Sequence, residues 1–152
     1  MIKFKEGSIL DAPERIICHQ VNCQGKMGRG IALEIRNKYP IVYDKYIELY
    51  NKYKLQPYKL LGSYQLVKVN NDRWVANIFG QNYYGLDKRY TDYNALVSGL
   101  SALFIRTNED IAIPYKMGCR NGGADWDKLM QILEILASDF KHDVIIYKLP
   151  KR

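Results

Sequence analysis

Two glycine-containing segments, each lying between an apolar run and a helical pattern, constrain this fold more than any other feature. The first, residues 21–30, follows the apolar run 15–20 and has three glycines in its last six residues. The second, residues 115–124, follows the apolar run 110–114 and also has three glycines. Apolar residues at helical spacing come after each segment. Strands that lead through glycine turns into helices predict an α/β fold with helices on both faces of a sheet.

The other periodicities extend this pattern along the chain. We expect further helices at residues 31–39, 41–53 and 92–105, and a last helix after Asp125. Further strands are expected at residues 2–4, 63–69, 73–79 and 143–149. Residues 70–72 have the sequence Asn-Asn-Asp, which is typical of a turn and predicts a hairpin between the two neighbouring strands. This hairpin makes the mostly parallel sheet mixed. Residues 80–91 are expected to form a long polar and aromatic loop.

Length and charge limit the classes of protein and partner. The 152 residues, with 47% hydrophobic and 26% charged side chains, suit a single domain spanning 1–152 with a core of its own. The net charge is +7, from 23 Lys and Arg against 16 Asp and Glu. Two interpretations of this charge stay open: a surface that attracts a polyanionic ligand, or a solvated basic surface.

Cysteine and histidine content argues against a structural metal site. Cys18, Cys23 and Cys119 form no CxxC pair, and His19 and His142 are the only histidines. No run approaches the roughly 18 apolar residues of a membrane span, and the start of the chain is unlike a signal peptide. We therefore expect free thiols, a cytoplasmic protein, no membrane association, no metal and no cofactor.

Both glycine segments have the means to hold an anion. Glycine permits positive φ and lets backbone N–H groups approach a ligand closely, and the following helix adds its positive N-terminal end. Because ligands of such folds lie at the carboxyl ends of the strands, both loops are expected at one edge of the sheet. There they suit a diphosphate held from two sides. The alternative is a pair of tight turns without a ligand.

The motifs themselves resemble those of a known family. The sequence HQVNCQG at 19–25, followed by MGRGIA at 27–32, closely resembles the first ribose- and phosphate-binding loop of macrodomains. The sequence MGC at 117–119, with GGADW at 122–126, resembles their second phosphate loop. Residues 79–81 and 90–93 resemble the middle segment of bacterial and phage members. These members group with ADP-ribose 1''-phosphate phosphatases and ADP-ribosyl-glutamate hydrolases.

The resemblance implies a three-layer α/β/α fold and ADP-ribose, or a derivative, as the ligand. It implies that Asn22 hydrogen-bonds the distal ribose and that the two loops enclose the diphosphate. The candidate ligand-binding residues are Ser8, Ile9, Asn22, Gly25, Met27, Gly28, Gly30, Ile31, Gln81, Met117, Gly118, Cys119, Arg120, Asn121, Gly122, Gly123 and Ala124. The candidate catalytic residues are Asn22, Gln24 and His19.

The chain departs from the family pattern at three places. Ser8 stands where the family usually has an Asp that reads the adenine amino group, and nearby Asp11 is a second candidate for this role. Arg120 stands at a frequent Gly and either reaches a phosphate or faces water. Gly80 or Gln81, and Gly122, occupy the places of the Lys and Asp of the glutamate-ester hydrolases. A lysyl intermediate is therefore not expected.

Several residues have a structural interpretation beside the functional one. Asn22 either binds ribose or caps its own loop, and His19 is either a general acid or base or a packed residue of the core. Cys23 and Cys119 are interpreted as small loop residues, and Asp92 and Asp125 as helix N-caps. Gln81 is a candidate for orienting a water.

Three functions follow from these expectations. The first is a hydrolase acting at the 1'' position of ADP-ribose, with the 1''-phosphate as the expected leaving group. The second is a module that binds ADP-ribose without catalysis. The third is a nucleic-acid binder, or an enzyme that removes ADP-ribose from nucleic acid or protein. The expected partners are ADP-ribose derivatives, and the expected oligomeric state is a monomer.

Overall fold

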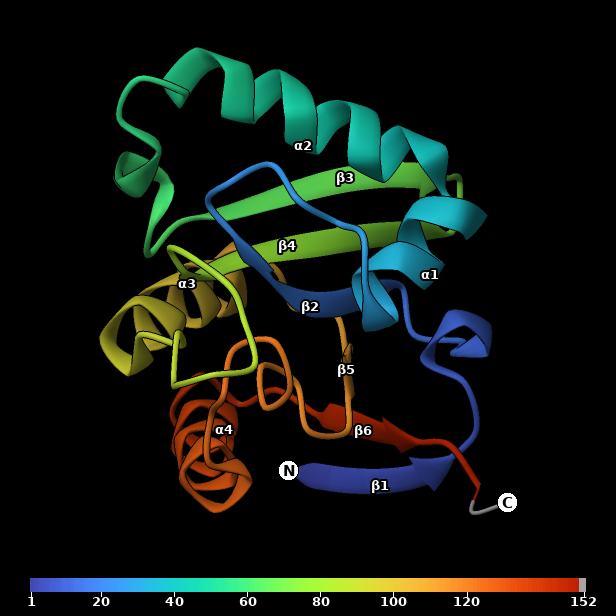
Figure 1. The fold of residues 1–152 in the computed structure, drawn as a ribbon. Helices are drawn as coiled ribbons and strands as arrows, with labels where there is room; N and C mark the ends of the chain where they lie inside the picture. The colour runs from blue at the N-terminus through green and yellow to red at the C-terminus, as the bar shows by residue number, and fades with distance from the viewer. Residues whose placement is uncertain (151–152) are drawn as a thin grey trace.

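The structure, a computed structural model, describes residues 1–150 (Figure 1). The strands are β1 (Ile2–Glu6), β2 (Ile16–Asn22), β3 (Tyr64–Asn70), β4 (Arg73–Gln81), β5 (Ile111–Pro114) and β6 (Val144–Lys148). The α-helices are α1 (Gly30–Lys38), α2 (Pro40–Tyr53), α3 (Tyr93–Arg106) and α4 (Trp126–Phe140). Two short 3₁₀ helices, η1 (Ile9–Asp11) and η2 (Pro57–Leu60), were not among the expected elements.

The strands form one mixed sheet in the order β1-β6-β5-β2-β4-β3. All neighbouring pairs are parallel except β3 and β4, which form the expected antiparallel hairpin. The mostly parallel, mixed sheet predicted from the sequence is confirmed. Its consequence for a site is that β5, β2 and β4, three neighbours in the sheet, all point their carboxyl ends to the same edge.

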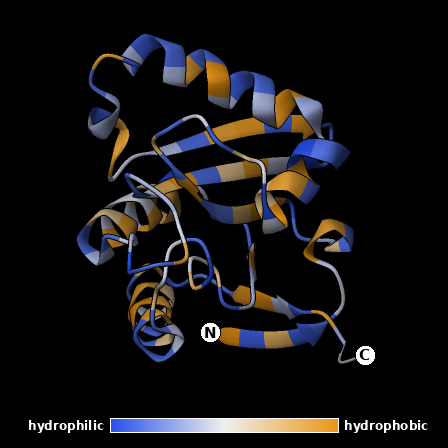
Figure 2. Cartoon of the chain, in the orientation of Figure 1, coloured by the Kyte–Doolittle hydropathy of each residue, from blue (hydrophilic) through white to orange (hydrophobic). Residues whose placement is uncertain are grey.

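The side chains of the central strands alternate between two apolar cores, one on each face of the sheet. Ile16 and Cys18 pack on the face covered by α3 and α4, whereas Ile17 and Val21 pack on the face covered by α1 and α2. The hydropathy colouring shows hydrophobic residues on the strands and on the helices beside them (Figure 2). A strand buried on both faces reads as a continuous apolar run, which is why β2 was recognisable from its sequence. The expected three-layer α/β/α arrangement is confirmed.

Two acidic side chains begin the helices that cover one face. Asp92 accepts a hydrogen bond from the backbone N–H of Ala95 at 3.0 Å and caps α3. Asp125 accepts from the backbone N–H of Asp127 at 2.9 Å and caps α4. Both predicted N-caps are confirmed. Such a cap satisfies a helix N–H that has no partner within the helix, and is worth about 1 kcal/mol.

The strand ends lie further along the chain than expected, and this matters for the site. β2 continues to Asn22 and β4 to Gln81, and these two residues are register partners beyond a local shift in the pairing. Residues assigned to loops from the sequence are therefore held by the sheet. None of the helices in residues 1–150 is long and apolar enough to cross a membrane.

Candidate functional site

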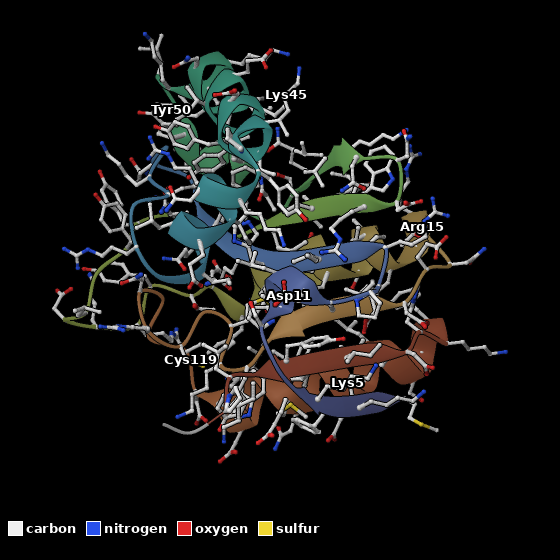
Figure 3. All side chains as sticks on the ribbon, turned by 90° about the vertical axis from the view of Figure 1, so that its right-hand side faces the viewer. Lys5, Asp11, Arg15, Lys45, Tyr50 and Cys119 are labelled. Atoms are coloured by element: carbon white, nitrogen blue, oxygen red, sulfur yellow. The ribbon has the colours of Figure 1, made fainter. Side chains whose placement is uncertain are left out.

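The two glycine loops meet at one edge of the sheet, as the sequence predicted. The first loop leaves β2, the second leaves β5, and the loop after β4 lies beside them (Figure 1). A side view places Cys119, on the second loop, at one end of the strands and Arg15 at the other end (Figure 3). This edge is where α/β folds place their ligands.

Two adjoining cavities occupy this edge. The first, of about 370 Å³, is lined by Gln20, Val21, Asn22, Gly25, Lys26, Met27, Gly28, Arg29, Ala32, Arg36, Tyr43, Gln81, Tyr84 and Asn121. The second, of about 630 Å³, is lined by Gln20, Arg29, Gly30, Ile31, Ala32, Gln81, Pro114, Tyr115, Lys116, Met117, Gly118, Cys119, Arg120, Asn121, Gly122, Ala124 and Trp126. Gln20, Arg29 and Gln81 are among the residues that line both. The volumes fall within the range of about 300–1,000 Å³ that small-molecule sites occupy.

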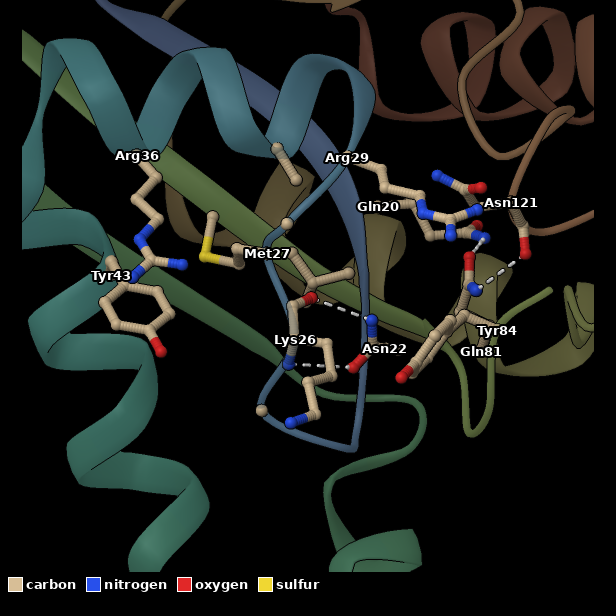
Figure 4. A pocket seen from close by; sticks show the side chains of 14 residues that line it. Gln20, Asn22, Lys26, Met27, Arg29, Arg36, Tyr43, Gln81, Tyr84 and Asn121 are labelled. Atoms are coloured by element: carbon tan, nitrogen blue, oxygen red, sulfur yellow. Dashed lines mark hydrogen bonds between the residues drawn. The ribbon is translucent and has the colours of Figure 1, made fainter.

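The first loop is organised by the side chain of Asn22. Its Nδ2 donates to the carbonyl of Lys26 at 2.9 Å (Figure 4). Its Oδ1 accepts from the backbone N–H of Gln24 at 2.9 Å and from the hydroxyl of Tyr46 at 2.9 Å. The backbone N–H of Lys26 also reaches Oδ1, at 3.4 Å. Asn22 therefore lines the first cavity while its amide caps the loop that forms the cavity wall.

The conformation of this loop requires glycine at Gly25. Its φ is +73°, and a Cβ added there would lie 3.1 Å from the ring of Tyr50 on α2. A residue with a side chain would be strained in this backbone conformation and would push the loop off α2. Gly25 thus sets the distance between the first loop and the helix behind it.

A buried cluster of amides ties the second loop to the sheet. Nε2 of Gln20 on β2 donates to Oε1 of Gln81 at 2.6 Å and to the hydroxyl of Thr91 at 2.8 Å. Thr91 in turn donates to the carbonyl of Gly118 at 3.2 Å, and Nε2 of Gln81 donates to the carbonyl of Asn121 at 3.3 Å. Three segments far apart in the sequence are therefore joined by side chains at the floor of both cavities.

The glycines of the second loop allow this close approach. A Cβ on Gly122 would overlap the carbonyl oxygen of Gly118 and the hydroxyl of Thr91, and a Cβ on Gly118 would lie 2.9 Å from Nε2 of Gln20. The carbonyl of Gly122 also accepts from the backbone N–H groups of Tyr90 and Thr91, both at 2.7 Å. The loop after β4 and the second loop therefore form one packed unit.

The two cavities are electropositive. Lys26, Arg29 and Arg36 line the first, and Arg29, Lys116 and Arg120 line the second. Within residues 1–150, no Asp, Glu or His side chain lines either cavity, and none of these five cations forms an ion pair. Unpaired cations in a concave site attract anionic ligands. The chemistry on offer comes from amides, hydroxyls, backbone N–H groups and cations.

The structure places His19 in the sheet, away from both cavities. Its side chain is fully buried, and Nε2 lies 2.6 Å from Oδ1 of Asn77 on β4. Burial lowers the pKa of His19 to about 4, and the hydrogen bond with Asn77 only partly offsets this effect. The packed interpretation of His19 describes this geometry, because a buried ring without access to the cavities cannot exchange protons with a ligand there.

Five other candidate residues also lie outside the cavity linings. Nε2 of Gln24 donates to Oδ1 of Asn82 at 3.1 Å. Gly123 is exposed, and its backbone N–H donates to the carbonyl of Arg120 at 3.3 Å. Ser8 caps η1 by accepting from the backbone N–H of Leu10 at 3.2 Å, and Ile9 is buried in the core beneath α1 and α2. Asp11 is exposed on η1 and pairs with Lys38 at 3.7 Å (Figure 3). The geometry thus gives Ser8 and Gln24 structural partners rather than a ligand-facing position.

The other predicted ligand-binding residues do line the cavities. Asn22, Gly25, Met27 and Gly28 line the first, Gln81 and Asn121 line both, and the second adds Gly30, Ile31, Met117, Gly118, Cys119, Arg120, Gly122 and Ala124. Cys119 is a free thiol whose pKa is raised by partial burial, and burial raises the pKa of the free thiol of Cys23 to about 12. Thiols held in the protonated form are poor nucleophiles, which agrees with their interpretation as small loop residues.

Sequence reasoning missed the cations and one aromatic side chain of the first cavity. Lys26, Arg29 and Arg36 line it together with Tyr43, whose ring centroid lies 3.6 Å from the guanidinium carbon of Arg36. Ala32 and Arg36 are four residues apart and share a face of α1, and Arg29 lies at the N-cap of this helix. The spacing of residues 32 and 36 was the available signal, but the sequence left open whether its basic residues face a ligand or solvent.

No protein-family model matches the chain. A curated DNA ADP-ribosyl glycohydrolase of Thermus aquaticus is 27% identical over 138 residues, covering 88% of this chain and 37% of the relative. A curated ADP-ribose 1''-phosphate phosphatase of Meyerozyma guilliermondii is 31% identical over 87 residues, covering 51% of this chain and 50% of the relative. The chain therefore spans half or less of the length of these two relatives. The solved macrodomain of Mycobacterium tuberculosis DarG has a TM-score of 0.82 and 25% identity, with 99% of both chains covered.

Proposed function

Since the chain belongs to the macrodomain family, we propose that it binds ADP-ribose derivatives and hydrolyses the bond at the 1'' position of their distal ribose. The observation that carries this proposal is the pair of adjoining electropositive cavities between the two glycine loops. Their shared boundary at Arg29, Gln81 and Asn121 suits one elongated ligand that extends through both. We propose that it acts as a monomer in the cytoplasm.

The diphosphate is assigned to the second cavity. Arg29, Lys116 and Arg120 line it, and the backbone between Gly118 and Ala124 closes one side. Charge-assisted hydrogen bonds from guanidinium and backbone N–H groups are the usual means of holding phosphate. Because no carboxylate of residues 1–150 lines this cavity, no negative side chain would repel the two phosphates there.

The distal ribose is assigned to the first cavity, beside Asn22 and the first loop. In the proposed reaction a water oxygen bonds to C1'', the bond from C1'' to its substituent breaks, and a proton passes to the leaving group. With amides and cations as the nearest polar groups, the rate enhancement would come from positioning and electrostatic stabilisation. This mechanism needs no metal ion, and no metal-binding group of His, Cys, Asp and Glu exists within residues 1–150.

The leaving group we favour is a nucleotide of DNA. The relative named DNA ADP-ribosyl glycohydrolase aligns with 88% of this chain, including both glycine loops. The second candidate is a 1''-phosphate, the leaving group expected from the sequence. It is favoured by phosphatase relatives that are 31–46% identical over 39–89 residues, which is 25–55% of the chain.

The test is isothermal titration with ADP-ribose, followed by turnover of two substrates. We expect a dissociation constant on the order of micromolar. An oligonucleotide carrying ADP-ribose and ADP-ribose 1''-phosphate are then supplied separately, and released ADP-ribose is quantified by chromatography. Turnover of the oligonucleotide alone supports the glycohydrolase, and turnover of the phosphate ester alone supports the phosphatase.

A third outcome would favour a binding module. If ADP-ribose binds but neither substrate is converted in single-turnover reactions with excess protein, the chain holds its ligand without catalysis. If ADP-ribose does not bind at all, the assignment of both cavities is wrong.

A further inference from the structure

We propose that Lys26, Arg36 and Tyr43 form a second phosphate-binding subsite, which holds a phosphate on the group attached to the distal ribose. This inference rests on the proposed function and extends it beyond ADP-ribose itself. Arg36 and Tyr43 line the first cavity but not the second. The close view places them across the cavity from Arg29 and Asn121, with Asn22 and Lys26 between (Figure 4).

The position of the subsite determines what can reach it. If the diphosphate occupies the second cavity and the distal ribose lies beside Asn22, the ligand extends along the first cavity in the direction of Arg36. The portion of a substrate that comes after the distal ribose is its 1'' substituent. The group that meets Arg36 and Tyr43 is therefore the leaving group, or the remainder of the molecule to which it belongs.

The charges indicate that this group is anionic. Arg29, Lys116 and Arg120 surround the cavity assigned to the diphosphate, which leaves Lys26 and Arg36 without a counter-charge from ADP-ribose. Neither cation forms an ion pair within residues 1–150, and no carboxylate of that part of the chain lines the first cavity. A half-buried, unpaired guanidinium has lost part of its hydration, and an incoming anion would restore those interactions.

The geometry of Arg36 suits a phosphate. Its guanidinium lies over the ring of Tyr43 at 3.6 Å, and this stacking fixes the plane of the side chain while leaving the N–H edges available. Such a preorganised fork can donate two parallel hydrogen bonds to phosphate oxygens. Arg36 makes no hydrogen bond to another residue of the described chain, so its N–H groups are not already committed.

Lys26 is anchored at its backbone rather than its side chain. Both its N–H and its carbonyl are hydrogen-bonded to the amide of Asn22, at 3.4 and 2.9 Å. The exposed ammonium therefore extends from a fixed point on the rim of the first cavity. Arg36 from α1 and Lys26 from the first loop thus add two cations to the lining of the first cavity.

Two kinds of substrate carry a phosphate in this position. One is the 1''-phosphate monoester, and the other is a nucleotide whose base is joined to C1'' and whose own phosphate lies further along. The shared chemistry is a phosphate beyond the distal ribose, and matched substrates separate the two sources. In the first arm, ADP-ribose is compared with ADP-ribose 1''-phosphate. In the second, an ADP-ribosylated nucleoside is compared with the same nucleoside within an oligonucleotide.

The test uses Arg36→Ala and Arg36→Lys, with Lys68→Ala as the control. Lys68 also lies over an aromatic ring, that of Trp74 at 6.0 Å, but lines neither cavity. We expect Arg36→Ala to lose at least tenfold in kcat/KM for the phosphate-bearing member of one pair, a larger loss than it shows in affinity for ADP-ribose. Arg36→Lys should recover part of the loss, and Lys68→Ala should lose nothing. The pair that responds identifies the source of the phosphate.

A binding measurement makes the test independent of turnover. Protein saturated with ADP-ribose is titrated with inorganic phosphate while the Arg36 Nε–H signal is followed by NMR. A saturable shift that is absent with chloride supports the subsite. Equal kcat/KM for wild type and Arg36→Ala on every substrate, or no shift with phosphate while ADP-ribose is bound, overturns this inference alone. Failure of the wild type to bind ADP-ribose removes the proposed function and the subsite with it.

Discussion

Two polar residues of the same strand, Asn22 and His19, illustrate how position along a strand decides the role of a side chain. Asn22 is the last residue of β2, so its amide reaches the backbone of the first loop and the edge of a cavity. His19 lies three residues earlier, where both faces of the sheet are covered, and its ring bonds to Asn77 of the neighbouring strand. Both residues were candidates from the sequence. Their distance from the end of β2 determines which of them reaches a cavity.

Replacing Asn22 with Ala is expected to weaken ADP-ribose binding by at least tenfold. The change removes the donor to the carbonyl of Lys26 and the acceptor for the N–H of Gln24, so the first loop loses its internal brace. We also expect a loss of about 1–3 kcal/mol in the free energy of unfolding, because buried partners are left unsatisfied. Calorimetric titration and urea denaturation measure the two effects. The exposed Asn51 of α2 offers the matched control, and equal behaviour of Asn22→Ala and Asn51→Ala would contradict the assigned role.

His19 is expected to make stability depend on pH in the acid range. Its pKa is about 4 in the folded protein and about 6.5 when unfolded, so the unfolded chain binds more protons between these values. The free energy of unfolding should therefore fall as the pH is lowered from 6.5 to 4, by up to about 3 kcal/mol from this residue. Denaturation with urea at a series of pH values measures the slope.

The variant His19→Gln isolates this contribution. A glutamine does not titrate, so the variant should be less stable at pH 7 but lose less stability on acidification than the wild type. If both proteins show the same dependence on pH between 6.5 and 4, the buried imidazole is not its source.

At the scale of elements, the two glycine loops could be predicted from the sequence, whereas the contacts between different elements could not. The glycines of both loops, the apolar runs before them and the cap at Asp125 are local signals, and each led to the observed element. The meeting of Arg36 and Tyr43 depends on how α1 packs against α2, which no local pattern specifies. The same holds for the cluster of Gln20 with Gln81, because their contact follows from strand order.

The packing of the second loop predicts opposite effects for two glycine substitutions. Gly122→Ala adds a Cβ that overlaps the carbonyl of Gly118 and the hydroxyl of Thr91, so the second loop must move away from the amide cluster. We expect at least a tenfold loss in affinity for ADP-ribose and a lower unfolding free energy. At Gly28 an added Cβ meets nothing within 4 Å and the backbone is not left-handed. Gly28→Ala should leave the unfolding free energy unchanged or raise it by up to about 1 kcal/mol.

Thermal denaturation and calorimetric titration of both variants measure these effects. Comparable destabilisation by Gly28→Ala would show that an added methyl group is unfavourable in these loops whether or not it meets a neighbouring atom, and would contradict the steric explanation. The steric explanation requires that only the crowded position be sensitive.

At the scale of the whole molecule, the net charge of +7 is less informative than where the carboxylates are absent. Acidic residues form ion pairs elsewhere, such as Asp143 with Lys3 and Glu109 with Arg15. Within residues 1–150, no acidic side chain lines either cavity. The sequence predicted the sign of the charge and the fold that concentrates it. It could not show the distribution, because the cations of one cavity come from residues up to about 90 positions apart.

This distribution predicts that ligand binding depends on salt more strongly than folding does. Between 0.1 M and 1 M sodium chloride the Debye length falls from about 10 Å to about 3 Å, and affinity for ADP-ribose should fall several-fold. The drop should be smaller in Arg120→Gln, which removes one cation from the second cavity. Titrations at four salt concentrations, with urea denaturation in the same buffers, separate the effects. An affinity that ignores salt would be inconsistent with an electrostatic site.

The order of strands in the sheet also has a consequence for the protein during its synthesis. β5 lies between β2 and β6 and is followed directly by the second loop, so a nascent chain released only to about residue 110 already contains the first loop but not its counterpart. Until β5 inserts, β2 has one unpaired edge, and the hydroxyl of Thr91 lacks its acceptor, the carbonyl of Gly118. On the proposed function, ligand capture by both loops therefore requires the chain to be released to about residue 124, and ADP-ribose binding by ribosome-bound chains of increasing length would report when the central strands join.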